Sequence, residues 1–212
     1  MRYLILVFFS ISWIAAVLLI NRLFAGHRLK INRLKAAQYI TSMAAIGILG
    51  EIAIDGFYKF AFNQPLWLYR LFPIHGGYTS VYSLFEWGLL GLYIYLLHQT
   101  LCERHRYSLY LFTAIFCVDA ILFELAFNGS YRLIFHNYIF YYLPRNLWHL
   151  SAIQAIPFYL LGGFLTMEII AHERRHIRRA IAYSAAFAIC LVGTGILLNL
   201  PTHSYALQVI GR

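Results

Sequence analysis

The chain has 212 residues, of which 61% are hydrophobic, 18% are aromatic and only 12% are charged. This composition excludes an ordinary soluble domain and is typical of a protein that crosses a membrane several times. The formal net charge of +9 does not indicate nucleic-acid binding, because most basic residues lie in the short segments between apolar stretches. We therefore predict an all-α, polytopic bundle of membrane helices.

Six runs of about 20 apolar residues each predict a membrane-spanning helix. In chain order, these runs cover residues 3–21, 36–58, 78–98, 108–127, 150–171 and 180–200. The first run is too long for the core of a signal peptide, and its basic residues follow it rather than precede it. Because the joining segments are short, we expect residues 1–212 to form a single membrane domain.

The basic residues predict the orientation of these spans. Of the 17 lysines and arginines, 11 lie after the first, third and fifth runs, as Arg28, Arg104 and Arg178 do. The positive-inside rule makes that side cytoplasmic. Both termini then lie outside, and we expect the protein in the cytoplasmic (inner) membrane of a bacterium.

Two apolar runs contain a glutamate that is followed by a similar pattern of residues. EIAIDGFYKFAFNQPLWLY begins at Glu51, and ELAFNGSYRLIFHNYIFYY begins at Glu124, with six of these 19 positions identical. With one inserted residue, His75 aligns with His149. This similarity predicts a duplicated two-helix unit. The repeat units cover about 36–98 and 108–171, and the flanking spans cover 3–21 and 180–200.

An ionisable side chain inside a bilayer is costly, so a repeated glutamate marks a candidate functional site. Asp55 follows Glu51 by one helical turn, and Glu86 lies at a similar depth in the next span. In a low-dielectric site a carboxylic acid retains its proton and can act as a general acid. Equally, these side chains could only join helices through hydrogen bonds. The candidate catalytic residues are Glu51, Glu124, Asp55, Glu86, His75 and His149.

The two connections that follow the glutamates are unusually aromatic. Trp67 and Tyr69 lie in the first connection, and Phe140 and Tyr142 lie in the second. One interpretation is an aromatic belt at the membrane interface. The other is a lid of short interfacial or re-entrant helices over a cavity, with these four side chains lining a substrate pocket.

Two further patterns have a simpler structural explanation. Thr79 and Ser80 are expected to cap the helix of the third run. His172, Glu173 and His176 fit the zinc pattern H-E-x-x-H, but arginines fill both middle positions and indicate a basic anchor of the fifth run. We predict no metal and no cofactor, with this histidine pair as the alternative metal site.

A larger set of residues between positions 50 and 179 supports a family resemblance. It consists of Glu51, Thr79, Ser80, Val81, Leu84, Phe85, Gly88, Glu124, Gly129, Arg132, Phe135, Tyr142, Pro157, Phe158, Gly162, Met167, Glu168 and Ile169. This stretch resembles the transmembrane protein 229 family, which is classified with bacterial proteins labelled putative ABC-transporter permeases. The resemblance implies a helical membrane protein, and the permease label implies transport.

A looser likeness concerns mechanism. Glu51 followed by Trp67-Leu68-Tyr69, and Glu124 followed by an aromatic triplet, resemble the duplicated units of membrane-bound lycopene cyclases. Small fungal membrane terpene cyclases similarly have one key acid in each half. The cyclase signature P-x-E-E is replaced here by the sequence PIHG. This likeness implies acid-catalysed cyclisation or isomerisation.

Three functions remain open at this point. The first is an intramembrane, acid-catalysed enzyme that acts on a lipid or isoprenoid. The second is a permease-like transport or binding subunit, and the third is a structural subunit of a larger membrane complex. We expect membrane lipids as partners, no nucleic acid, and either a membrane-protein partner or a second copy of the chain.

Overall fold

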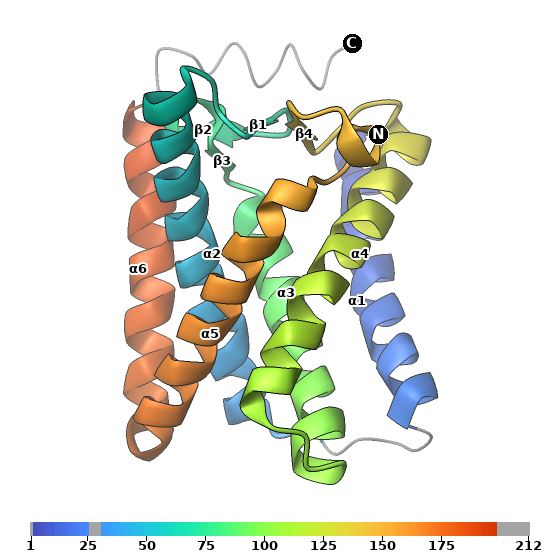
Figure 1. The fold of residues 1–212 in the computed structure, drawn as a ribbon, viewed down its shortest axis with the longest axis vertical. Coiled ribbons are helices and arrows are strands. Elements are labelled where there is room, and N and C mark those ends of the chain that lie inside the picture. Colours follow the sequence, from blue (N-terminus) through green and yellow to red (C-terminus); the bar gives the residue numbers. More distant parts are fainter. Residues whose placement is uncertain (1, 26–30, 199–212) are drawn as a thin grey trace.

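The computed structural model describes residues 2–25 and 31–198. Six α-helices follow one another in an up-and-down bundle (Figure 1). They are α1 (Arg2–Ala25), α2 (Arg33–Phe62), α3 (Ser83–His98), α4 (Leu109–Phe135), α5 (Ile156–His172) and α6 (Ile177–Leu198). The predicted helical class is therefore confirmed for the described part of the chain.

Five helices are long and apolar enough to cross a membrane, namely α1, α2, α4, α6 and the segment Ile153–His172 that contains α5. The third predicted span is shorter than expected, because α3 begins at Ser83 and has 16 residues. The residues before it form a strand and a turn, and a π-helix (Gln99–Arg104) extends it at the other end. Sixteen α-helical residues rise about 24 Å, which is less than the ~30 Å of a typical hydrocarbon core.

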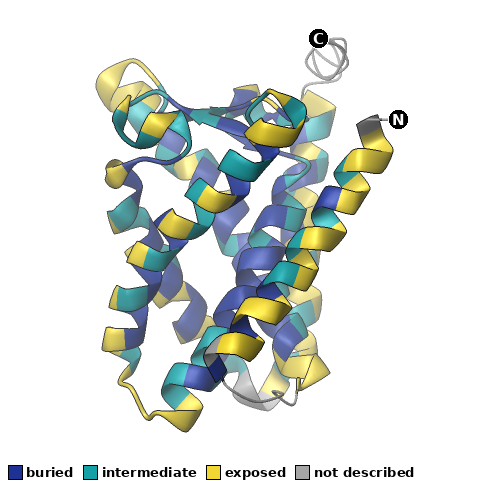
Figure 2. Ribbon diagram, turned by 90° about the vertical axis from the view of Figure 1, so that its right-hand side faces the viewer, coloured by how far each residue is buried: buried dark blue, intermediate teal, exposed yellow. Residues whose placement is uncertain are grey.

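Large apolar side chains cover the outer surface of the bundle. Phe60, Leu133 and Tyr183 are 90%, 80% and 73% exposed. Exposed residues are also frequent along α1, at the edge of the bundle (Figure 2). A monomeric soluble protein rarely presents so much exposed apolar area, which is what lipid-facing helices require.

The helices α2 and α4 begin and end in the same way. The side chains of Asn32 and Ser108 cap their N-termini by accepting hydrogen bonds from backbone N–H groups of the first turn. Asn63 and His136 follow their last turns in the left-handed conformation, with φ of 57° and 53°. This local chemistry stops both helices at the same end of the bundle.

The joining segments α3–α4 and α5–α6 lie at the opposite end of the bundle, together with the end of α1 and the start of α2 (Figure 1). Lys35 and Glu103 form an ion pair of 3.2 Å there. The described basic residues of the joining segments thus lie at one end of the bundle, whereas Arg28 and Lys30 fall outside the described residues.

The other end carries short strands, and not the interfacial or re-entrant helices of the second interpretation. The strands β1 (Trp67–Tyr69) and β4 (Phe140–Tyr142) pair in antiparallel register, with Trp67 opposite Tyr142 and Tyr69 opposite Phe140. A second small ladder joins β2 (Pro73–Ile74) to β3 (Thr79–Ser80). Both β1 and β4 alternate buried, half-buried and buried residues, which is the two-residue period of a strand with one covered face. Pairing satisfies the backbone polar groups that face the partner strand, which lowers the cost of placing these segments within the protein.

Candidate functional site

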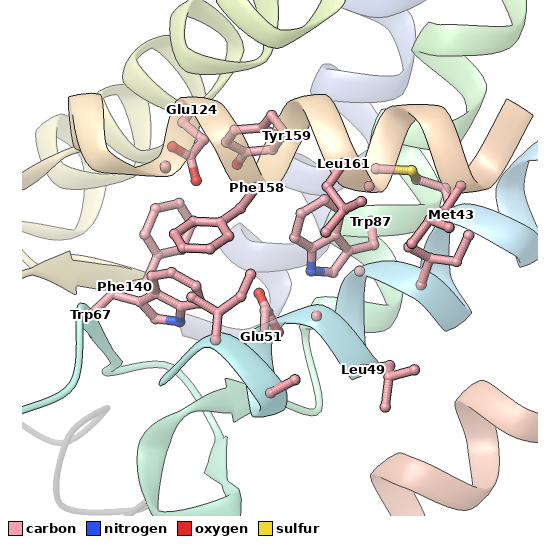
Figure 3. A pocket seen from close by; sticks show the side chains of 18 of the residues that line it. Met43, Leu49, Glu51, Trp67, Trp87, Glu124, Phe140, Phe158, Tyr159 and Leu161 are labelled. Carbon is pink, nitrogen blue, oxygen red and sulfur yellow. The ribbon is translucent and has the colours of Figure 1, made fainter. Parts of the chain in front are cut away.

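A cavity of about 380 Å³ is lined mainly by residues of α2 and α5, together with residues of the β1–β4 pair. Glu51 from α2 and Glu124 from α4 both line it, and their carboxyl groups approach it from opposite walls (Figure 3). The rest of the lining is mainly aromatic and aliphatic. The four aromatic residues predicted for a substrate pocket all belong to it: Trp67, Tyr69, Phe140 and Tyr142.

The β1–β4 register brings these aromatic residues together. The rings of Trp67 and Tyr142 are 5.6 Å apart, and those of Tyr69 and Phe140 are 5.5 Å apart. All four residues are buried. The strand pair therefore forms an aromatic roof over the two carboxyl groups.

Glu51 is 4% exposed and is hydrogen-bonded to the hydroxyl groups of Tyr69 and Thr79. The Tyr69 hydroxyl also lies 3.0 Å from Oε2 of Glu86, whose Oε1 is buried without a partner among the described residues. A phenol has a single hydrogen, so it donates to one carboxyl group and accepts from the other. The two contacts together require one of these two carboxyl groups to carry a proton.

Glu124 is held by the same kinds of group. The Tyr142 hydroxyl lies 2.9 and 3.3 Å from its two oxygens, and the Ser151 hydroxyl donates to Oε2. Burial, and next the neighbouring glutamate charges, raise the pKa of the Tyr69 and Tyr142 phenols well above the usual 10. Both phenols therefore remain protonated and act as donors at neutral pH.

Asp55 has a different position from the one predicted. It is fully buried and does not line the cavity. Its Oδ1 accepts hydrogen bonds from the backbone N–H groups of Leu66 at 2.7 Å and Trp67 at 3.2 Å. The residue thus fastens the start of β1 to α2, and the structure assigns it no contact with the cavity.

Asn128 holds β4 in the corresponding way on α4. Its Oδ1 accepts from the N–H of Ile139 at 3.1 Å, and its amide donates to the carbonyls of Phe140 at 2.8 Å and Leu150 at 3.1 Å. Each strand is therefore positioned by one polar side chain that lies one turn after a cavity glutamate.

Replacing Asp55 by asparagine should leave the stability of the protein equal or raise it. Asn128 shows that an amide can fasten such a strand, and Oδ2 of Asp55 is buried without a partner among the described residues. Asp55→Ala should instead cost about 1–3 kcal/mol, because buried N–H groups lose their acceptor. Equilibrium unfolding in mixed micelles measures both variants, and an equal loss in the two would show that the charge itself is needed.

The two predicted histidines lie outside the cavity. Nε2 of His75 is 2.8 Å from the carbonyl of Leu191 on α6. Nδ1 of His149 is 2.7 Å from the carbonyl of Tyr142, and its ring stacks on Tyr141 at 4.3 Å. Both histidines have a positive φ, of 52° and 63°, so they serve in tight bends of the connections.

The alternative metal pattern is also not assembled. His172 ends α5, and the following residues, Glu173–His176, form a 3₁₀ turn. The H-E-x-x-H pattern requires one continuous α-helix to place both imidazoles on the same face. Within residues 2–25 and 31–198, no group of three or more His, Cys, Asp or Glu residues could hold a metal ion.

Thr79 does not cap a helix as the sequence predicts, and the role of Ser151 is not evident from the sequence. In the structure, Ser80 and Ser83 make the turn before α3, and the Thr79 hydroxyl donates to Glu51. A signal was present, because each glutamate is followed by a hydroxyl partner 28 or 27 residues later. Trp87 and Tyr159 also line the cavity and were not predicted.

No family model matches the chain, and searches of curated proteins and of solved structures also give no match. The resemblance to the transmembrane protein 229 family therefore stays a prediction, and function has to be argued from the site.

Proposed function

We propose that this protein is an integral membrane enzyme that transfers protons to and from an apolar lipid or isoprenoid, as a cyclase or isomerase does. The observation that carries this proposal is that Glu51 and Glu124 face one mainly apolar cavity beneath an aromatic roof. General acid–base chemistry needs two such groups within reach of one substrate. An apolar surrounding strengthens every electrostatic interaction that develops during the reaction.

The reaction conserves all atoms. The protonated carboxyl group of Glu51 delivers its proton to one carbon of a C=C bond, whose electron pair forms the new C–H bond. The other carbon becomes a carbocation, which a second C=C bond can attack to close a ring. The Glu124 carboxylate then takes a proton from the neighbouring carbon, and the electrons of that C–H bond form a new C=C bond. When the product leaves, the proton returns from Glu124 to Glu51.

We assign the acid role to Glu51 because Tyr69 links it to Glu86. Because the phenol has a single hydrogen, the carboxyl groups of Glu51 and Glu86 must carry one further proton between them. The hydroxyl groups of Tyr142 and Ser151 hydrogen-bond to Glu124, and donors of this kind suit a carboxylate. Aromatic faces in the lining would stabilise a carbocation by cation–π attraction.

The proposal includes a duplicated unit and a defined membrane orientation. In its support, Glu51–Tyr69 and Glu124–Tyr142 are both spaced by 18 residues, and each glutamate has a second hydroxyl partner. The strand that follows each glutamate pairs with its counterpart. The basic joining segments at one end favour a bacterial inner membrane with both termini outside.

The lining of the cavity favours an enzyme over a permease for a polar or cationic solute. Such a solute needs water or polar groups along its path, whereas this cavity is lined mainly by aromatic and aliphatic side chains. The cavity also gives the buried carboxyl groups a possible reaction space, which a purely structural subunit does not require.

Solvent deuterium tests the proposed chemistry without knowledge of the substrate. The protein would be reconstituted in nanodiscs made from its host's own lipids and equilibrated in an excess of D₂O. The lipids would then be extracted and analysed by mass spectrometry. Because the Glu51 proton then comes from D₂O, we expect one lipid or isoprenoid species to gain deuterium at carbon. The double variant Glu51→Gln, Glu124→Gln should give no gain. Identical spectra for both proteins would contradict the proposal.

Tyr69→Phe should reduce turnover and stability more than Tyr142→Phe. The first change breaks the link between Glu51 and Glu86 and leaves two buried carboxyl groups without this hydrogen-bond partner, whereas the second affects Glu124 alone. Each lost partner of a buried group costs about 1–3 kcal/mol. Turnover and unfolding of the two variants would be measured side by side, and equal losses would show that the shared proton has no special role.

A further inference from the structure

We infer that the substrate enters sideways from the bilayer, through an opening between α2 and α5, and that it is a neutral, extended, unsaturated hydrocarbon chain. This inference rests on the proposed function, since it names the route and the substrate class of the same cavity. It depends on which lining residues are exposed, which are covered, and which leave space.

The cavity reaches the surface between α2 and α5. Leu49 and Phe57 on α2 line it and are 46% and 57% exposed. Leu161 and Leu165 on α5 also line it and are 57% and 45% exposed. Apolar side chains that both line the cavity and lie on the outer surface form the rim of an opening toward lipid, which we call the α2–α5 opening.

The route from the aqueous end is covered. The roof consists of β1 and β4, whose lining side chains are 6% exposed or less. Backbone hydrogen bonds continue the strand pairing, from the N–H of Arg70 to the carbonyl of Ile139 and from the N–H of Leu143 to the carbonyl of Leu66. A molecule arriving from water would have to break this pairing, whereas a molecule in the bilayer meets the α2–α5 opening directly.

Two glycines at the cavity provide free space rather than close packing. A Cβ on Gly50 or Gly162 would meet its nearest neighbour only at 3.9 or 4.0 Å. By contrast, a Cβ on Gly47 would lie 2.1 Å from the Trp87 ring, and one on Gly163 would lie 2.8 Å from Phe116. Gly50 and Gly162 therefore keep the wall of the cavity thin without being needed for helix contact.

The lining also defines the chemistry of the occupant. It extends along α2 from Met43 to Phe57, a rise of about 21 Å, which suits a long chain lying parallel to the helix. Among the described residues, no lysine or arginine lines the cavity, so a phosphate or diphosphate group would find only carboxyl groups there. A neutral isoprenoid and a neutral acyl chain share the required chemistry.

The test uses filling substitutions and photoreactive probes. Gly162→Phe, and separately Gly50→Phe, would place a ring in the α2–α5 opening. Gly193→Phe on α6 is the matched control, because a Cβ there meets nothing within 4 Å. Each protein in nanodiscs would be labelled with a diazirine-bearing prenol, a diazirine-bearing unsaturated fatty alcohol, or a diazirine-bearing prenyl diphosphate. Labelled peptides would be mapped, and melting temperatures would confirm folding.

We expect a neutral probe to label peptides of α2 and α5, in the parent and in Gly193→Phe. Labelling should fall about tenfold or more in both filled variants. Stronger labelling by the prenol would identify an isoprenoid chain, and stronger labelling by the fatty alcohol would identify an acyl chain. Unchanged labelling in the filled variants, or equal capture of the diphosphate, would overturn the inference. Since labelling needs no turnover, it should persist in the double variant Glu51→Gln, Glu124→Gln, so a failed reaction is distinguishable from a wrong route.

Discussion

Replacing either cavity glutamate by glutamine should lower turnover about 100- to 10,000-fold, the range expected when a general acid or base is lost. Glutamine keeps the size and one carbonyl oxygen of the side chain, so Tyr69 or Tyr142 retains an acceptor. It cannot deliver or accept the proton of the reaction at neutral pH. Product formation from the lipid identified by deuterium labelling measures the effect in Glu51→Gln and Glu124→Gln.

The matched control for this experiment is Glu168→Gln. Glu168 is an exposed residue of α5 that does not line the cavity, so its replacement should leave turnover unchanged. Because the two glutamates act on one substrate, the double variant should be hardly slower than the worse single variant. If both single variants kept full activity, the carboxyl groups would have only a structural role.

Asn128→Ala should be among the most destabilising single substitutions outside the cavity. The side chain satisfies one backbone N–H and two backbone carbonyls, which belong to Ile139, Phe140 and Leu150. Each buried polar group left unpaired costs about 1–3 kcal/mol, so the loss should reach about 3 kcal/mol or more. The β4 strand would lose its attachment to α4, and with it the aromatic roof would loosen. Equilibrium unfolding in mixed micelles measures the loss.

Asn137→Ala is the control for this second experiment. Asn137 lies in the same connection and is half-buried, but its Oδ1 accepts only from the neighbouring N–H of Tyr138 at 2.8 Å. The loss of one such local bond should cost about 0.5–1.5 kcal/mol. Equal losses in the two variants would mean that Asn128 does not position the strand.

The helices could be predicted because membrane spans leave a direct signal in composition and in the distribution of charge. The glutamate pair could also be found, since carboxyl groups inside apolar runs are rare enough to identify Glu51 and Glu124. The spacing of Tyr69 and Tyr142 from these glutamates was visible in the repeated pattern. Glu51 and Glu124 could be found because a carboxyl group is an unusual residue type within an apolar run.

The connections could not be predicted with the same success. The triplets WLY and FYY are too short for periodicity to separate a strand from an interfacial helix, and their pairing joins segments 73 residues apart. The side chains of His75 and His149 could not be placed either. Each of these residues has a left-handed backbone conformation, and its side chain contacts a backbone carbonyl outside the cavity. Asp55 was predicted to be catalytic, because the sequence does not show that β1 lies beside it. Its role as an acceptor for backbone N–H groups becomes visible only once β1 is placed.

The most direct test of this account is an experimental structure of the protein in nanodiscs made from its host's lipids. We predict elongated density in the cavity that begins at the surface between α2 and α5 and passes between the carboxyl groups of Glu51 and Glu124. Two carboxyl groups that point into separate helix contacts, with side chains filling the space between them, would contradict the account.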